Sequence, residues 1–115
     1  MRVETLLIAG DACIDEIASV LGPLLSGEAT ESAYGFSWEN GLRFIGDAER
    51  TGDYYDDDCG LSLSRYRFEV STQAPDGREW MEKAFDLLSA STDLDLLWLT
   101  DMQHLNREKT LEPVI

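Results

Sequence analysis

The chain has few of the residues that build metal and catalytic centres. Among its 115 residues it holds one histidine, His104, and two cysteines, Cys13 and Cys59. One histidine excludes a zinc site built from several histidines, and two distant cysteines exclude a Cys-x-x-Cys metal clip and a disulfide framework. We therefore expect reduced thiols and no bound metal or cofactor.

Basic residues are also scarce. The chain has 9 Lys and Arg against 23 Asp and Glu, a net charge of −14, whereas about 2 to 8 charges suffice to keep a small domain soluble. A strong negative field costs stability through self-repulsion, but it speeds association with a positively charged partner. It also repels nucleic acid and anionic membrane surfaces, which argues against both as direct ligands. The charge predicts a protein that binds a basic protein.

Long apolar runs are missing. No run approaches the roughly 18 apolar residues of a membrane span, and acids such as Glu4 and Asp11 interrupt the N-terminal segment where a signal peptide would be uncharged. We expect a cytoplasmic location. The 43% hydrophobic content is enough to bury one core, so residues 1–115 are predicted to form a single domain.

Apolar periodicity predicts alternating strands and helices. The Asn40-Gly41 pair is a strong hairpin signal, and Asp76 with Glu79 three residues later is a capping-box pattern at a helix start. The polar segment 101–109 is predicted to make a short helical turn. The expected elements are a strand over 3–8, a helix from Asp11 to Gly22, strands over 34–38 and 42–45, a strand over 61–71 bulged near Ser64, a helix after Asp76 and a strand over 94–100.

This order of elements favours an α+β fold. Two helices separated by a hairpin cannot both be simple crossovers of one all-parallel sheet. We expect a mixed, mostly antiparallel sheet with both helices on one face. A ferredoxin-like sandwich with an extra strand fits this order.

The segment 46–58 is the most acidic part of the chain, with six acids against Arg50 alone. We expect a long exposed loop or a ragged hairpin, which could be a solvated turn, a cation site or a protein-binding loop. Consecutive aspartates cannot all face one ion, and the spaced ligands of a calcium loop are missing. Tyrosines between acids are typical of interface hot spots. The candidate partner-binding residues are Trp38, at the hairpin tip, and Asp53, Tyr54, Tyr55, Asp56, Asp57 and Asp58.

Catalytic candidates are few. Cys13, near the start of the first helix, and His104 could form a nucleophile pair only if the fold brings them together, and a small buried core thiol is the simpler expectation for Cys13. Phosphate-binding loops and the Gly-x-Ser-x-Gly elbow are absent from the sequence. We expect no enzymatic activity. Trp98 is predicted to lie in the core, whereas Trp38 and Trp80 are expected to be partly exposed.

In its compact α+β character, its acidity, its GDYYDDDC segment (52–59) and its LDLLWLTDMQHL segment (94–105), the chain resembles the small acidic bacterial immunity proteins that neutralise toxins. The resemblance implies a stoichiometric inhibitor that covers the basic active site of a nuclease or similar secreted toxin. One alternative is a DNA mimic, although its carboxylates should follow the spacing of phosphates. Another is a small metal-binding or enzymatic domain that uses Asp56 to Asp58 with His104.

Overall fold

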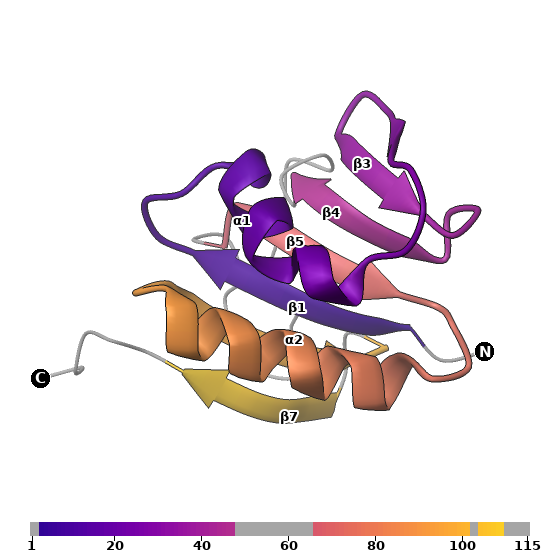
Figure 1. The fold of residues 1–115 in the computed structure, drawn as a ribbon. Coiled ribbons are helices and arrows are strands. Elements are labelled where there is room, and N and C mark those ends of the chain that lie inside the picture. Colours follow the sequence, from indigo (N-terminus) through magenta and orange to yellow (C-terminus); the bar gives the residue numbers. More distant parts are fainter. Residues whose placement is uncertain (1–2, 48–65, 102–103, 110–115) are drawn as a thin grey trace, which may run out of the picture.

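The computed structural model describes residues 3–47, 66–101 and 104–109. Within these ranges the chain forms strands, two α-helices and one short 3-10 helix (Figure 1). In chain order the elements are β1 (Glu4–Ala9), α1 (Ile14–Leu21), η1 (Gly22–Leu24), β2 (Thr30–Glu31), β3 (Gly35–Trp38), β4 (Arg43–Asp47), β5 (Phe68–Thr72), α2 (Gly77–Ser91), β6 (Asp95–Thr100) and β7 (His104–Lys109).

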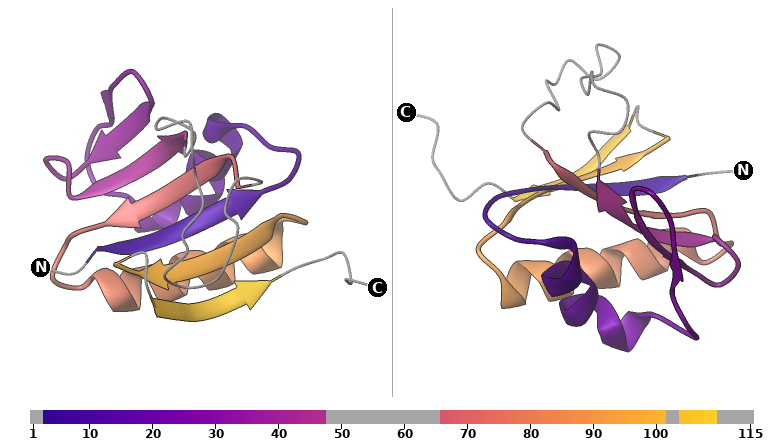
Figure 2. Two further views of the ribbon diagram at one scale, coloured as in Figure 1. Left: turned by 180° about the vertical axis from the view of Figure 1, so that it is seen from behind. Right: turned by 90° about the horizontal axis from the view of Figure 1, so that it is seen from above.

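The strands form one sheet in the order β2-β3-β4-β5-β1-β6-β7. All of its described neighbours are antiparallel, and α1 and α2 lie together on one face of the sheet (Figure 2, right). These findings confirm the α+β class, the antiparallel sheet and the placement of both helices on one face. The ferredoxin-like arrangement stays a prediction.

Strand β1 lies in the interior of the sheet, between β5 and β6, and is buried along its whole length. Leu6 and Ile8 belong to the main core, which lies between the sheet and the helices. Leu7 and Ala9 point the other way, as successive side chains of a strand must, and join a second buried cluster with Leu97. A strand that is buried on both faces has no reason to alternate, which explains the unbroken apolar run in the sequence.

The predicted hairpin is confirmed as β3 and β4, which pair from Gly35 with Gly46 to Trp38 with Arg43. Its connection is a four-residue loop in which Glu39 and Asn40 adopt left-handed φ angles of 53° and 59°. Gly41 follows with φ at 86°, a conformation that glycine adopts at little cost. The Asn-Gly signal therefore located the turn correctly, but the turn is longer than a two-residue hairpin.

Helix α1 begins later than predicted. Its N-cap is Cys13, not Asp11, and the Cys13 thiol is exposed. The expected buried core thiol is therefore wrong. The physical reason is that Cys13 precedes the first helical turn, so its side chain does not share the apolar stripe on which Ile17 and Leu21 are buried.

Strand β7 corrects the prediction of a helical turn over 101–109. Residues His104–Lys109 pair with β6 and form one edge of the sheet. An edge strand has one strand neighbour and open surroundings on its other side, so polar residues are acceptable there. The register shifts between Trp98 and Leu99. Trp98 pairs with Arg107 and Leu99 with Leu105, so β7 has one extra residue between these two pairs. Such a bulge interrupts the alternation of side chains along β7 while the strands on either side of it stay paired.

Several expectations concern residues 48–65, which lie outside the described ranges: most of the acidic 46–58 segment, the start of the 61–71 strand and the bulge near Ser64. Gly46 and Asp47 prove to be the end of β4 rather than loop residues. The described part of the predicted 61–71 strand begins at Phe68, the first residue of β5. Tyr66, which precedes it, belongs to the second cluster, whereas Val70 belongs to the main core.

Candidate functional site

Trp38 is the one predicted partner-binding residue within the described ranges; Asp53, Tyr54, Tyr55, Asp56, Asp57 and Asp58 lie outside them. Trp38 is only 8% exposed and belongs to the main core. Its expected partial exposure is wrong, because the end of β3 is covered by the core rather than open to solvent. Trp38 therefore has little surface to offer a partner.

Arg43 is the centre of an ion-pair network between the hairpin and α2. Its side chain is buried, yet it donates from Nη2 to both carboxylate oxygens of Asp76, at 3.0 and 3.1 Å. Nη1 donates to the Thr72 hydroxyl at 3.1 Å, and Nε donates to Glu39. The network satisfies all three guanidinium nitrogens of a buried cation, which burial would otherwise penalise.

Trp80 lies beneath this network. The guanidinium carbon of Arg43 is 4.6 Å from the centroid of the Trp80 ring, and the indole Nε1 donates to the carbonyl of Leu24 at 2.8 Å. Trp80 is 5% exposed, so the expected partial exposure is wrong here too. The cation-π contact and the indole hydrogen bond together hold α2 against β4 and η1.

A second polar network crosses the sheet at the end where β1 begins. Glu4, 2% exposed, accepts hydrogen bonds from Trp98 Nε1 at 2.9 Å and from the Thr100 hydroxyl at 2.7 Å. Asn106 on β7 donates to the same hydroxyl oxygen at 2.7 Å and accepts from Arg78 at 3.3 Å. These bonds connect the edge strand β7, through β6, to the interior strand β1. Trp98 itself is buried, as predicted.

Other cations connect β7 to α2. Arg107 pairs with Asp86 at 2.8 Å, and its guanidinium carbon is 4.2 Å from the centroid of the Phe85 ring. Lys109 donates from Nζ to the carbonyl oxygens of Ser89, at 2.9 Å, and Thr92, at 3.2 Å. Lysine is favourable at this position because the last carbonyls of a helix carry partial negative charge. These basic side chains therefore serve internal packing.

Many carboxylates, in contrast, have no basic partner within the described residues. Asp15 and Glu16 lie in the first turn of α1, where their negative charges interact favourably with the positive end of the helix dipole. The exposed carboxylates that make neither an ion pair nor a hydrogen bond among the described residues are Asp11, Asp15, Glu16, Glu28, Glu31, Glu79, Glu82, Asp93 and Glu108. The described surface is thus strongly anionic, while most of its cations are held in internal contacts.

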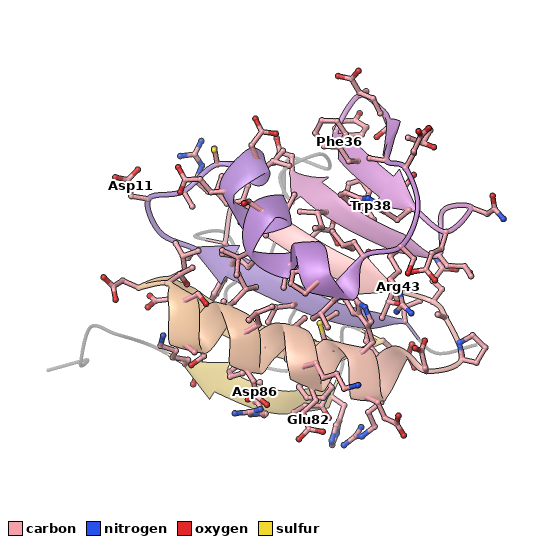
Figure 3. The ribbon with its side chains drawn as sticks, in the orientation of Figure 1. Asp11, Phe36, Trp38, Arg43, Glu82 and Asp86 are labelled. Carbon is pink, nitrogen blue, oxygen red and sulfur yellow. The ribbon has the colours of Figure 1, made fainter. Side chains whose placement is uncertain are left out.

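A groove of about 830 Å³ lies between α1 and the C-terminal end of α2. Carboxylates of Asp11, Glu16 and Asp93 line it together with apolar side chains such as Ile17 and Leu94. Figure 3 shows Asp11 on the loop that follows β1, at the end of the molecule where α2 also ends. Neither the groove nor the Arg43 network was predicted, since both join residues that are distant in the sequence.

The register keeps Cys13 and His104 at opposite ends of the sheet. Thr100 pairs both with Glu4, the first residue of β1, and with His104. Cys13 follows Ala9, the last residue of β1. The six residues of β1 alone span about 17 Å, so the fold does not form a nucleophile pair from these two residues.

Metal ligands do not gather among the described residues either, since no group of three or more His, Cys, Asp or Glu side chains there could hold an ion. The absence of a metal requirement stays a prediction, because Asp56 to Asp58 lie outside these ranges. Within the described part of the chain, neither helix is long and apolar enough to cross a membrane.

We compared the chain with protein-family models, with curated proteins and with solved structures, and none of the three comparisons found a match.

Proposed function

We propose that this protein is an acidic, non-catalytic inhibitor that binds a basic surface of another protein. The observation that supports it best is the distribution of charged side chains. Most described cations are engaged in internal contacts such as Arg43 with Asp76 and Arg107 with Asp86, whereas exposed carboxylates on both helices lack basic partners there. A partner that supplies the missing positive charge would gain both steering and specific contacts.

The more specific proposal is an immunity protein that acts in the cytoplasm on a cognate toxin. It rests on the resemblance in acidity, size and the GDYYDDDC segment. In this role the protein covers the basic active site of its target and catalyses no reaction itself. Binding is then stoichiometric, and the negative field accelerates encounter by roughly 10 to 10³ times at low salt.

The experiment uses the product of the neighbouring reading frame as the candidate target. Cells that express this product alone should stop growing, and co-expression of the acidic protein should restore growth. With purified components, inhibition should saturate at a fixed molar ratio. Inactivation of many target molecules by one molecule of the acidic protein would contradict the proposal, because it would indicate an enzyme.

The ionic strength of the association reaction provides a second measurement. Screening acts over about 8 to 10 Å at physiological salt, so added salt should slow association much more than it speeds dissociation. An uncharged osmolyte at matched osmolarity is the control. An association rate that does not change with salt would contradict charge steering.

A further inference from the structure

The groove between α1 and the end of α2 combines an apolar floor with an acidic rim. Ala12 and Val20, both half-buried, supply accessible apolar surface in the groove, and the buried Ile17 and Leu94 lie beneath it. The exposed carboxylates of Asp11, Glu16 and Asp93 line the same groove from two separate segments of the chain. Surfaces of this kind suit lysine and arginine, whose aliphatic stems pack on apolar groups while their charged ends reach polar ones.

We propose that this groove is the seat for a lysine- or arginine-bearing segment of the basic partner protein, an inference that rests on the proposed function. Its volume of about 830 Å³ is near the upper end of the roughly 300 to 1,000 Å³ range of ligand pockets. It can therefore hold more than one side chain of an extended segment. Neither of the polar networks around Arg43 and Glu4 uses the groove carboxylates.

The chain itself shows how a cation is bound at this place. Lys109, which lines the groove, puts its ammonium group on the carbonyl oxygens of Ser89 and Thr92 at the end of α2. The same helix end therefore attracts positive charge, and the three carboxylates extend this attraction across the groove to α1. Among the described residues that line the groove, Lys109 alone is basic, and its ammonium is already bound.

A metal ion fits the groove poorly. Ca²⁺ and Mg²⁺ need several oxygen ligands at about 2.0 to 2.6 Å from one point, and no described group of acidic side chains gathers closely enough to hold one. Carboxylates that are spread along a groove match the separated charges of a basic peptide instead.

The test measures binding of an acetylated and amidated tetra-arginine peptide at low salt, both by calorimetry and by amide chemical shifts of the labelled protein. The shifts should concentrate in residues 11–20 and 89–94. The triple variant D11N/E16Q/D93N should weaken binding by roughly fivefold or more, as expected for a few partly exposed ion pairs.

The matched control is E28Q/E31Q/E82Q, which removes three exposed carboxylates outside the groove and changes the net charge equally. It should weaken binding less than twofold. Equal losses in both variants would overturn the groove as the site but leave the proposed function standing, because the general field would then explain binding. Failure of the peptide to bind, or shifts that map elsewhere, would also overturn it.

A second pair of variants does not depend on removing charge from the rim. Ala90→Arg places a guanidinium inside the groove, because Ala90 lines it. Ala33→Arg adds the same charge at an exposed residue that does not line the groove. The first should abolish peptide binding and the second should preserve it.

Spermine, which carries amines without a peptide backbone, should bind more weakly than the peptide; equal affinity would overturn the assignment to a protein segment. If the cognate target is inhibited fully by Ala90→Arg, the groove is not the site even though the inhibitor function holds.

Discussion

Asp76 is the N-cap residue of α2, but both of its carboxylate oxygens accept hydrogen bonds from Nη2 of Arg43, and its side chain does not cap the helix. The capping-box pattern therefore located the start of the helix correctly, since Asp76 is its N-cap, but the expected side-chain cap by Asp76 is not formed. The competing partner is a buried guanidinium from 33 residues earlier in the chain. Because the donor is a cation, these hydrogen bonds also bring the attraction of an ion pair.

Replacement of Arg43 by Met should lower the free energy of unfolding by about 2 kcal/mol, because it removes a buried hydrogen-bonding centre and the cation-π contact with Trp80. Urea unfolding followed by tryptophan fluorescence measures the change. Lys83→Met, on the exposed face of α2, is the control and should change stability by less than about 0.5 kcal/mol. Equal effects of the two variants would show that the network contributes nothing specific.

The Arg43–Asp76 pair should show a modest coupling energy. The Asp76 side chain is 57% exposed, so solvent screens the pair, and a double-mutant cycle with R43M and D76N should give about 1 kcal/mol or less. The coupling should shrink as salt is added. A coupling that is several times larger and independent of salt would mean that Asp76 is more enclosed than its exposure indicates.

Gly35 and Gly46 face each other across β3 and β4, and a Cβ on Gly35 would collide with the carbonyl oxygen of Ile45. Gly35→Ala should therefore destabilise the protein by about 2 kcal/mol or more, as backbone atoms must shift. Gly22→Ala is the control, because a Cβ there meets nothing within 4 Å. It should be neutral or stabilise by up to about 1 kcal/mol. Thermal unfolding of both variants distinguishes the two cases.

The acidic segment 46–58 should contribute to partner binding. Replacing Asp56, Asp57 and Asp58 by Asn removes three charges without much change of shape, so both the affinity for the cognate partner and its salt dependence should fall. Affinity is measured at low and moderate salt for the wild type and the variant. If both quantities are unchanged, the segment is a solvated turn and plays no part in binding.

Folding should require no metal. Two distant cysteines, one histidine and no spaced carboxylate loop leave the sequence without a typical structural site. A chelator should leave the thermal midpoint where it is, since only a ligand that binds the native state raises stability by mass action. A drop of several degrees, reversed by adding back one divalent ion, would contradict this.

Elements whose stability is encoded locally were predictable from the sequence. The apolar run of β1, the period-two pattern around Phe36 and the helical stripe from Met81 to Leu88 each report their own burial, so β1, β3 and α2 were found. The edge strand β7 was missed because the polar residues His104–Lys109 become a strand only through pairing with β6. Nothing next to Trp80 in the sequence indicates that Arg43 and Leu24 will enclose it.

The candidate site was least predictable where it depends on the meeting of distant segments. The groove joins the loop after β1 to the turn before β6, and no local pattern links Asp11 to Asp93. The sequence does show the excess of acids, which pointed to a basic partner. Which carboxylates are left without a basic partner depends on which ones the basic residues contact, and only the fold reveals that.

The interior position of β1, between two strands made late in the chain, affects biosynthesis. Among the strands of this sheet it is made first, yet its neighbours β5 and β6 are made much later; Trp98 and Glu4, which are joined by a hydrogen bond, are 94 residues apart. Until these strands arrive, the apolar residues of β1 have no sheet to join, and such non-local pairing is slow. Nascent or truncated chains that end before β6 are therefore the species most exposed to aggregation and to chaperone capture.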